Sequence, residues 1–443
     1  MTRSVSASLP EVVPAEVQLT RQVRLCYLPM EHCKGNYLSL RFLLPLGGMT
    51  STYALLPYVL SRGSTDYPDI DAIDRAADLL YGAEISPMVG SEGEWQVIGF
   101  SASFLADRMA PDGCPILEGV LHLLSSLLLS PRTEGATLLP ESVESERGKL
   151  CDRLRSLKDN PDLYAIKRSE ELMCAGEPYA RYERGEESEV AAVTPEALTK
   201  AWQTLLSTAP LCITYAGDCA LEKLIPLLRS RFGALTAPPA PLPPTEVIRR
   251  AKGGLRRFTE KLPNGQCQLI IGLRSGSVIG DGDHAAFSLL YAMLSSAPTA
   301  RLFTKVREER SLCYNCSALS DSHKGILLIT CGLRRERLQE AEDAIFDQLR
   351  ALAEGDFTDE EFESAKRWLM GRYPILEDSP IALAGWYFSR SPLGIAESPR
   401  IEAERIRRVT RTDVMRAAGR LSPDAIYTLL DRSRSRKEDA REN

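Results

Sequence analysis

The chain has 443 residues, 44% hydrophobic and 26% charged, an ordinary globular composition with enough length for two hydrophobic cores. Its net charge of −6 and pI near 5.6, with Lys and Arg interspersed among Asp and Glu, argue against a nucleic-acid-binding surface and against an acidic membrane as partner. The 11 cysteines, an odd number, indicate free thiols in a reducing compartment instead of a disulfide framework.

Neither the start of the chain nor its most apolar run indicates a membrane protein. Residues 1–16 lack the apolar stretch of a signal peptide, and residues 119–130 form a run too short and too interrupted to cross a bilayer. We therefore expect a cytoplasmic protein.

The first half of the chain shows strand and helix patterns in alternation. An apolar, strand-length run at residues 37–45 leads into a helical pattern at 53–61. Further patterns follow, which predict a hairpin, a long helix with early carboxylates and a closing strand: residues 83–93 with 94–105, 140–157, and 211–216.

Residues 235–254 separate this half from the next. The proline-rich run near the start of this segment cannot continue a helix or a central strand, so we expect a semi-rigid linker with few contacts. The second half then repeats the order, with a strand, a helix capped by Asp283, a long helix and a closing strand: residues 267–273, 284–295, 359–373 and 426–430.

The two halves are also related residue by residue. Glu144, Asp159, Pro161 and Ala165 reappear as Glu363, Asp378, Pro380 and Ala384, each at one offset (363 − 144 = 219). A repeat of that size predicts two homologous globular domains and no solenoid. We place them at residues 1–234 and 255–443, joined by the linker at 235–254, and expect each half to fold alone.

The mixture of strands and helices, without strict βαβ alternation, predicts an α+β fold. Each domain should be a mixed sheet with helices packed on one face.

Familiar catalytic motifs are absent from the sequence. The four histidines lie more than five residues apart, and neither H-E-x-x-H, H-x-x-E-H nor G-x-S-x-G occurs. The glycines between Gly276 and Gly282 lack the spacing of a phosphate-binding loop. Cys313 and Cys316 form a lone C-x-x-C without a second pair nearby, so we expect free thiols and no bound metal or other cofactor.

One segment is more specific. Residues 299–314, TARLFTKVREERSLCY, resemble the S-R-L-F-x-x-V-R-E-x-x-x-L-x-Y signature in the second homologous domain of the insulinase-like, pitrilysin-type zinc metallopeptidases. The resemblance extends over nearly the whole chain and implies paired α+β domains. Within the family, the chain is most similar to bacterial subunits that lack the zinc motif and accompany an active companion.

The resemblance also shows where this chain departs from active members. The H-x-x-E-H segment falls on residues 54–58, so the ligand histidines become Ala54 and Tyr58 and the general-base glutamate becomes Pro57. Glu146 matches the third ligand position, but one carboxylate does not hold zinc tightly, so we expect it to be a surface or interface charge. No zinc hydrolysis by the chain alone is expected.

The resemblance implies a role for Arg307 and Tyr314, which match the family's arginine and tyrosine that close over the zinc-bearing domain. A guanidinium and a phenol are donors suited to the oxyanion of peptide hydrolysis. We expect these two residues to contact substrate.

Three hypotheses of function remain open. The first is a non-catalytic subunit of a heterodimeric zinc peptidase, with a zinc-bearing homologous subunit and a peptide substrate as partners and no nucleic acid or membrane. The second is a peptide-binding or scaffold protein without hydrolysis, for which the strand at 94–105 is a candidate exposed edge. The third, an enzyme with displaced chemistry, has no residues to support it.

Overall fold

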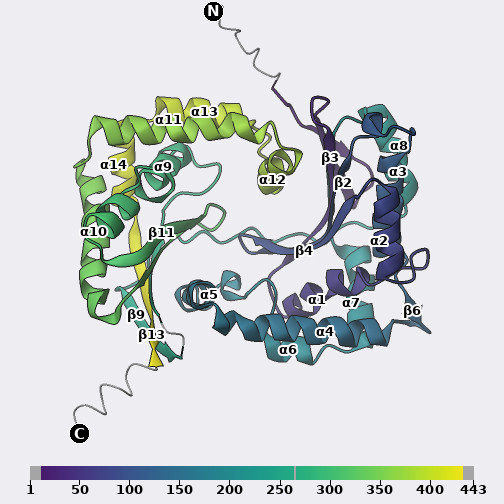
Figure 1. Ribbon diagram of the computed structural model, residues 1–443, viewed down its shortest axis with the longest axis horizontal. Coiled ribbons are helices and arrows are strands. Elements are labelled where there is room, and N and C mark those ends of the chain that lie inside the picture. The colour runs from purple at the N-terminus through teal and green to yellow at the C-terminus, as the bar shows by residue number, and fades with distance from the viewer. Residues whose placement is uncertain (1–10, 264–265, 433–443) are drawn as a thin grey trace, which may run out of the picture.

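A computed structural model describes residues 11–263 and 266–432. Figure 1 shows two sheets on opposite sides of the molecule, each with most of its helices on the outside. The expected α+β fold is confirmed. None of the helices in these ranges is long and apolar enough to cross a membrane.

The N-terminal sheet has six strands in the order β1-β2-β8-β3-β5-β4. The strands are β1 (Ala15–Gln18), β2 (Val23–Pro29), β3 (Gly35–Pro45), β4 (Glu84–Glu92), β5 (Trp95–Leu105) and β8 (Leu211–Gly217). The predicted hairpin is β4 and β5. Strand β5, however, pairs with both β3 and β4, so the expected exposed edge at residues 94–105 is wrong and β4 forms the edge instead.

The helices of this half cover the outer face of the sheet and build its main core. They are α1 (Thr50–Leu60), α2 (Ile70–Leu79), α3 (Ile116–Leu129), α4 (Pro140–Arg155), α6 (Glu187–Ala191), α7 (Pro195–Thr208) and α8 (Leu221–Phe232). The near-continuous apolar sequence of α3 and the alternating apolar residues of β3 meet in this core. A two-stranded ribbon, β6 (Thr133–Glu134) with β7 (Thr137–Leu138), precedes α4.

The C-terminal sheet has five strands in the order β11-β12-β10-β13-β9. The strands are β9 (Arg256–Leu262), β10 (Cys267–Arg274), β11 (Cys313–Asp321), β12 (Ile326–Leu333) and β13 (Ser422–Asp431). Strand β11 lies at one edge and, among the described strands, pairs with β12 alone, antiparallel.

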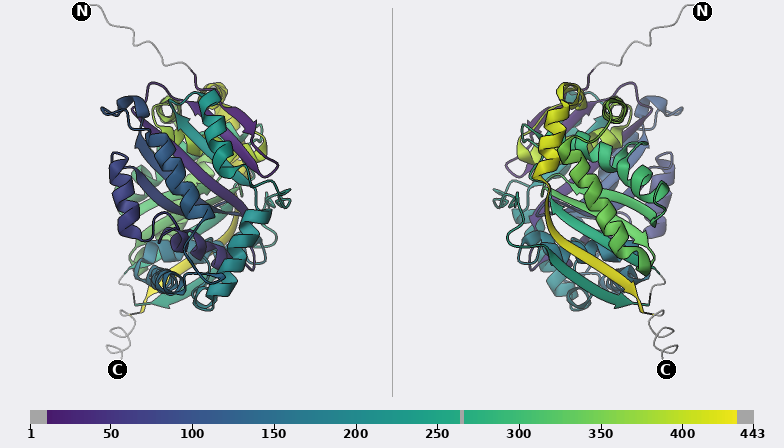
Figure 2. Two further views of the ribbon diagram at one scale, coloured as in Figure 1. Left: turned by 90° about the vertical axis from the view of Figure 1, so that its right-hand side faces the viewer. Right: turned by 90° about the vertical axis from the view of Figure 1, so that its left-hand side faces the viewer.

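Helices again cover one face of this sheet. They are α9 (His284–Tyr291), α10 (Leu338–Glu354), α11 (Asp359–Leu376), α13 (Pro399–Arg408) and α14 (Arg411–Arg420), and Figure 2 shows α10 lying across the outer face. Two π-helical segments, η4 (Ala292–Ser296) and η5 (Leu302–Glu308), lie between α9 and β11. Asp283 precedes α9, but its side chain pairs with Arg420 and accepts from Ser277 Oγ at 3.1 Å, so the expected cap is wrong.

Each half lends one helix to the other half's sheet. Helix α5 (Pro161–Met173) packs on β10 and β13, and helix α12 (Pro380–Arg390) packs on β2, β3 and β8. Ala165 and Ala384, which correspond in the repeat, are both fully buried at these contacts. The second face of each sheet is therefore covered by a helix from the opposite half. The expectation of helices on one face describes each half's own helices and omits this exchanged helix.

The linker at residues 235–254 is hydrogen-bonded to the first half of the chain. Trp95 Nε1 donates to the carbonyl oxygen of Pro243 at 2.6 Å, and the backbone N–H of Glu94 donates to Thr245 Oγ1 at 3.1 Å. The backbone N–H of Glu246 donates to Glu94 Oε2 at 3.0 Å. The expectation of few contacts at residues 235–254 is therefore wrong, because the segment lies against the hairpin of the first half.

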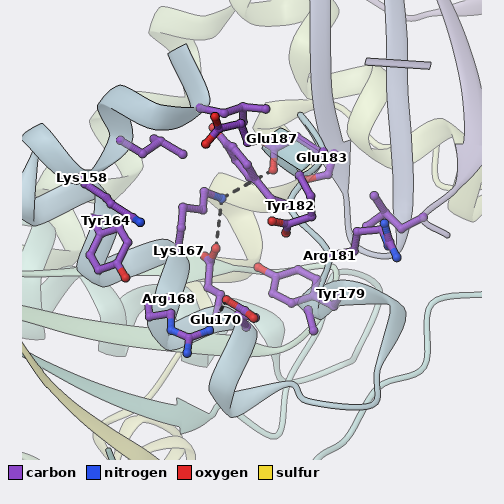
Figure 3. A pocket seen from close by; sticks show the side chains of 18 of the residues that line it. Lys158, Tyr164, Lys167, Arg168, Glu170, Tyr179, Arg181, Tyr182, Glu183 and Glu187 are labelled. Carbon is purple, nitrogen blue, oxygen red and sulfur yellow. Dashed lines mark ion pairs between the residues drawn. The ribbon is translucent and has the colours of Figure 1, made fainter. Parts of the chain in front are cut away.

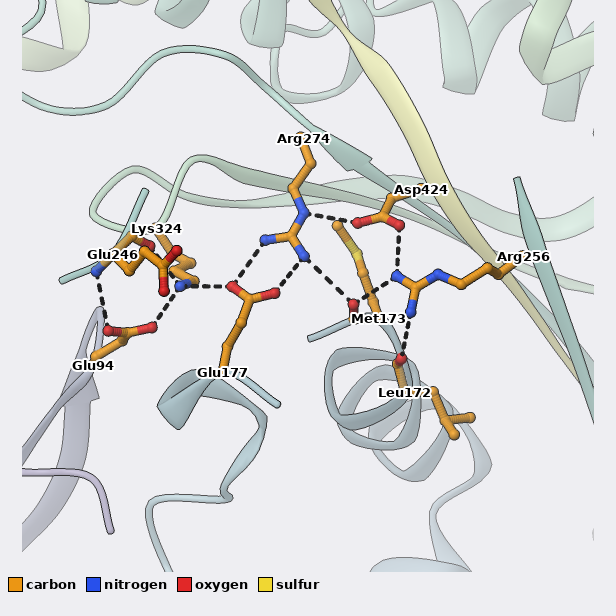
Figure 4. A network of polar contacts seen from close by, with 9 residues as sticks. All are labelled: Glu94, Leu172, Met173, Glu177, Glu246, Arg256, Arg274, Lys324 and Asp424. Carbon is orange, nitrogen blue, oxygen red and sulfur yellow. Dashed lines mark hydrogen bonds and ion pairs between the residues drawn. The ribbon is translucent and has the colours of Figure 1, made fainter. Parts of the chain in front are cut away.

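A chain of buried charges joins the halves beneath this segment (Figure 4). Lys324 Nζ lies 2.5 Å from Glu94 Oε1 and 2.7 Å from Glu177 Oε2. Arg274 continues the chain, with Nη2 at 2.6 Å from Glu177 Oε1 and Nε at 2.8 Å from Asp424 Oδ2. Buried charges are tolerated only when they are paired, so these ion pairs fix the position of one half relative to the other.

Candidate functional site

The positions to which the family resemblance assigns the zinc motif, Ala54, Pro57 and Tyr58, lie on helix α1. Ala54 is fully buried and Pro57 is buried inside the helix, where both pack in the N-terminal core. Neither side chain offers a donor atom. Tyr58 is only partly buried and faces polar neighbours.

Two guanidinium groups flank Tyr58. Arg184 Nη1 donates to the Tyr58 hydroxyl at 2.7 Å, and the Arg153 guanidinium lies over the Tyr58 ring, 4.8 Å from its centre. A divalent cation needs anionic or neutral lone-pair donors, so two cations next to the only remaining polar side chain oppose metal binding here.

Glu146 lies on helix α4 and, among the described residues, its carboxylate pairs with two cations and not with Tyr58. Its carboxylate is buried and is held by Lys149 Nζ at 2.7 Å and by Arg62 Nε at 3.8 Å. The expectation of a surface or interface charge is wrong, because the residue is an internal ion-pair partner. The α4 residue in contact with Tyr58 is Arg153, two turns further along the helix.

The second half carries Arg307 and Tyr314, and the structure brings them together. Arg307 lies in the π-helical segment η5 and Tyr314 near the start of β11, and both line one open cavity of about 660 Å³. Tyr314 is 54% exposed, which is unusual for a large aromatic residue. The Arg307 guanidinium rests over the Phe303 ring, 5.0 Å from its centre, and has no ion pair to a carboxylate of the described residues.

Sequence reasoning missed a third member of this cavity. Arg334, just after β12, donates from Nε to the Tyr314 hydroxyl at 3.1 Å. This bond leaves the phenol proton free to be donated to a ligand, and the tyrosine raises the pKa of Arg334. With Arg337 and Ser311 also in the wall and Glu308 as its one carboxylate, the cavity is rich in donors and suits a carbonyl oxygen or a carboxylate.

A cysteine cluster adjoins this cavity. The sulfurs of Cys313, Cys316 and Cys331 lie within 4.8 Å of one another, and theirs is the one grouping of metal-binding type found in the described residues. Cys313 lines the cavity. The sequence could not show the third thiol, because Cys331 comes from the neighbouring strand β12.

A second cavity, of about 230 Å³, lies in the first half between α4, α5 and the segment after α5 (Figure 3). Lys167 projects into it and pairs with Glu170 at 3.0 Å and Glu183 at 3.6 Å. Burial raises the pKa of Glu170, although the Lys167 ammonium opposes this shift. The ammonium of Lys167 is thus paired within the cavity, and the described residues place no metal-ligand cluster there.

Comparison with known proteins supports the resemblance seen in the sequence. Residues 192–369 match a family model described as the peptidase M16 inactive domain. The chain is 26% identical over 385 residues to the probable inactive metalloprotease YmfF of Bacillus subtilis, a match that covers 85% of this chain and 88% of that protein. The insulinase-like, pitrilysin-type resemblance and the non-catalytic status are thereby confirmed.

Solved structures share the fold. A conserved protein from Enterococcus faecalis superposes with a TM-score of 0.86 at 21% identity, over 94% of this chain and 98% of that chain. The periplasmic protease PqqL of Escherichia coli superposes with a TM-score of 0.72 at 16% identity, over 97% of this chain but only 49% of that one.

Proposed function

We propose that this chain is the non-catalytic subunit of a heterodimeric zinc peptidase. In this proposal a homologous partner carries the H-x-x-E-H motif, and Arg307 and Tyr314 bind the peptide carbonyl that the partner's zinc activates. The observation that carries the proposal is the shared cavity of Arg307 and Tyr314, whose donors are exposed and unused by carboxylates of the described residues.

The first half supports the same division of labour. Ala54 and Pro57 supply no ligand, and the cations at Tyr58 oppose a metal. We infer that the zinc motif has been lost in this chain. The pair in the second half would have no use in peptide hydrolysis unless another chain supplied the metal.

A partner of similar size is consistent with the comparisons. In PqqL the region that matches this chain is about half of a longer protease. We propose that the second half of the assembly is here a separate chain. The free thiols of all 11 cysteines are consistent with assembly in the cytoplasm.

The experiment is to produce this chain together with a homologous H-x-x-E-H chain from the same source and to measure peptide turnover. Tyr314→Phe removes one oxyanion donor, so turnover by the assembled complex should fall by about 10²-fold. Arg307→Ala should lower turnover or raise KM. Arg310→Ala is a matched control, because Arg310 is also a partly exposed arginine of this segment but pairs with Asp347 at 3.7 Å.

Two results would contradict the proposal. One is a lack of any complex between the two chains. The other is an assembled complex whose turnover is unchanged by Tyr314→Phe and Arg307→Ala, in which case a peptide-binding scaffold is the better account. In that account the strand available for β-augmentation is the edge strand β4 or β11 and not β5.

A further inference from the structure

A β-bulge brings two cysteines of β11 onto one face of the sheet. Residues three apart on a regular strand point to opposite faces. Here the register with β12 shifts between Cys313 and Asn315, so that Cys313 lies opposite Leu333 and Cys316 lies opposite Cys331. Leu333 and Cys331 share a face of β12, and therefore Cys313, Cys316 and Cys331 all point to the helix-covered side.

The three thiols converge at the rim of the C-terminal core. Cys316 and Cys331 are buried and Cys313 is half-buried. All three sulfurs lie within 4.8 Å of one another. Three thiolates around one zinc or copper ion stand about 4 Å apart, given metal–sulfur bonds of about 2.3 Å.

This geometry favours a metal over a disulfide that includes Cys313. A disulfide requires sulfurs about 2.05 Å apart and Cα atoms within about 7 Å. Cys313 and Cys316 are three residues apart along an extended strand, and Cys331 lies diagonally across from Cys313. A bridging ion spans such separations without movement of the strands.

We propose that Cys313, Cys316 and Cys331 form a three-thiolate site for a thiophilic d¹⁰ cation, Zn²⁺ or Cu⁺. Soft thiolates select these ions, and a tetrahedral zinc would take its fourth ligand from solvent in the cavity that Cys313 lines. The evidence for this site does not rest on the proposed peptidase role, although the site adjoins the same cavity and lies on the strand that carries Tyr314.

The charges around the site suit an anionic cluster. Hydrogen bonding from the thiols of Cys316 and Cys331 lowers the pKa of Cys313, and the nearby Arg307 guanidinium adds to that effect. The same hydrogen bonds to Cys313, together with burial, raise the pKa of Cys316 and Cys331, so a metal ion must displace their protons when it binds. Three thiolates with Zn²⁺ carry one negative charge, which Arg307 is placed to offset. A site in this position would hold the bulge at Tyr314 rigid.

The test uses the full-length chain, stripped of metal and kept reduced. Zn²⁺, and in a separate arm Cu⁺, is titrated in competition with a chromophoric chelator, and Co²⁺ reports thiolate ligation through its charge-transfer absorption. We expect one ion per chain, with affinity lowered by at least about 100-fold in Cys313→Ser, since even the loss of an outer-shell partner costs about 10- to 100-fold. Cys267→Ser is the control, because Cys267 is a buried thiol of the adjacent strand β10 outside the cluster.

The buried members need a second variant, since Cys331→Ser places a hydroxyl in the core. Cys316→Ala keeps a small apolar side chain, and circular dichroism checks its fold. Binding of neither ion, or binding that Cys313→Ser and Cys316→Ala leave unchanged, would overturn the proposal. Recovery of Cys316 and Cys331 as a disulfide from cells would overturn it as well.

Discussion

Arg153 holds its guanidinium 4.8 Å from the centre of the Tyr58 ring, at a position that the family resemblance assigns to a zinc ligand. Arg184 donates to the hydroxyl of the same tyrosine. In the proposed loss of the zinc motif, a phenol and two guanidinium groups stand where active relatives would carry two ligand histidines and a metal. This arrangement stabilises the helix pair α1 and α4 without a metal.

The first prediction concerns metal binding by this half. In the Cys313→Ser background, which removes the proposed thiolate site, the chain should hold no zinc after dialysis, as elemental analysis will measure. Adding Glu146→Gln should leave the metal content unchanged and lower stability by only about 1 kcal/mol, because the cations that lose their partner, Lys149 and Arg62, are 49% and 33% exposed and solvent screens them. Tightly held zinc that disappears with Glu146→Gln would show that the carboxylate is a ligand.

The second prediction concerns the exchanged helices. Ala384→Glu places a carboxylate in the fully buried contact of α12 with the N-terminal sheet and should lower the free energy of unfolding by about 3 kcal/mol or more. Ile381→Glu is the control, because Ile381 on the same helix is exposed, and it should change stability by less than about 0.5 kcal/mol. Urea denaturation of both variants measures the difference.

The same exchange bears on whether the halves fold alone. A chain ending at residue 234 lacks α12 and would expose the apolar face that helix covers. We now expect the separate halves to aggregate or to bind a dye for exposed apolar surface, and to form a stable species only when mixed. Separate halves that unfold cooperatively as monomers would show that the exchange is dispensable.

Local patterns were sufficient for most elements of the fold. The apolar runs predicted β3, β8 and β10, and the early carboxylates predicted α4 and α11, because those signals depend on neighbouring residues. The repeat paired Ala165 with Ala384, but it could not tell that each helix packs on the other half's sheet. That contact joins elements at least 94 positions apart in the sequence (267 − 173 = 94) and leaves no local pattern.

The site was predictable only in part. The sequence signature contains Arg307 and Tyr314. Cys331 on β12 and Arg334 directly after it reach the same cavity wall and cysteine cluster, but they belong to no motif. The bulge at Tyr314 turns the Cys313 side chain to the other face of the sheet. On a regular strand, the three-residue spacing would have placed Cys313 and Cys316 on opposite faces. Likewise, the family resemblance matched Glu146 to the third zinc-ligand position. In the structure, the packing of α1 on α4 brings Arg153, and not Glu146, to Tyr58.

The third prediction concerns the buried charges of Figure 4. Burial would raise the pKa of Glu177, but the bonds and charges of Arg274 and Lys324 outweigh it and lower the pKa. Since the folded-state pKa lies below the unfolded value of about 4.3, the carboxylate adds stability above that pH. This stability is lost as the pH falls through the folded-state pKa.

The measurement is the free energy of unfolding between pH 7 and pH 3. Glu177→Gln should cost about 3 to 5 kcal/mol at pH 7, because Lys324 and Arg274 lose a buried partner, and the cost should shrink below about pH 4. Glu340→Gln, which breaks the exposed pair with Arg337, should cost less than about 1 kcal/mol at every pH. A Glu177→Gln cost that is the same at pH 7 and pH 3 would contradict the assigned pKa direction.

The last prediction concerns the reactivity of Cys313 in the metal-free chain. Because hydrogen bonds from Cys316 and Cys331 and the charge of Arg307 lower its pKa, Cys313 is a thiolate at a pH where an ordinary thiol, with a pKa of about 8.5, is protonated. Its alkylation by iodoacetamide, followed by peptide mass analysis, should therefore change little between pH 6 and pH 8. Cys33 is a matched half-buried thiol whose pKa is raised by burial and by Asp378, so its rate should rise about tenfold for each pH unit. Arg307→Ala should make the Cys313 profile steeper, whereas a wild-type profile as steep as that of Cys33 would show that neither the thiol cluster nor Arg307 stabilises the Cys313 thiolate.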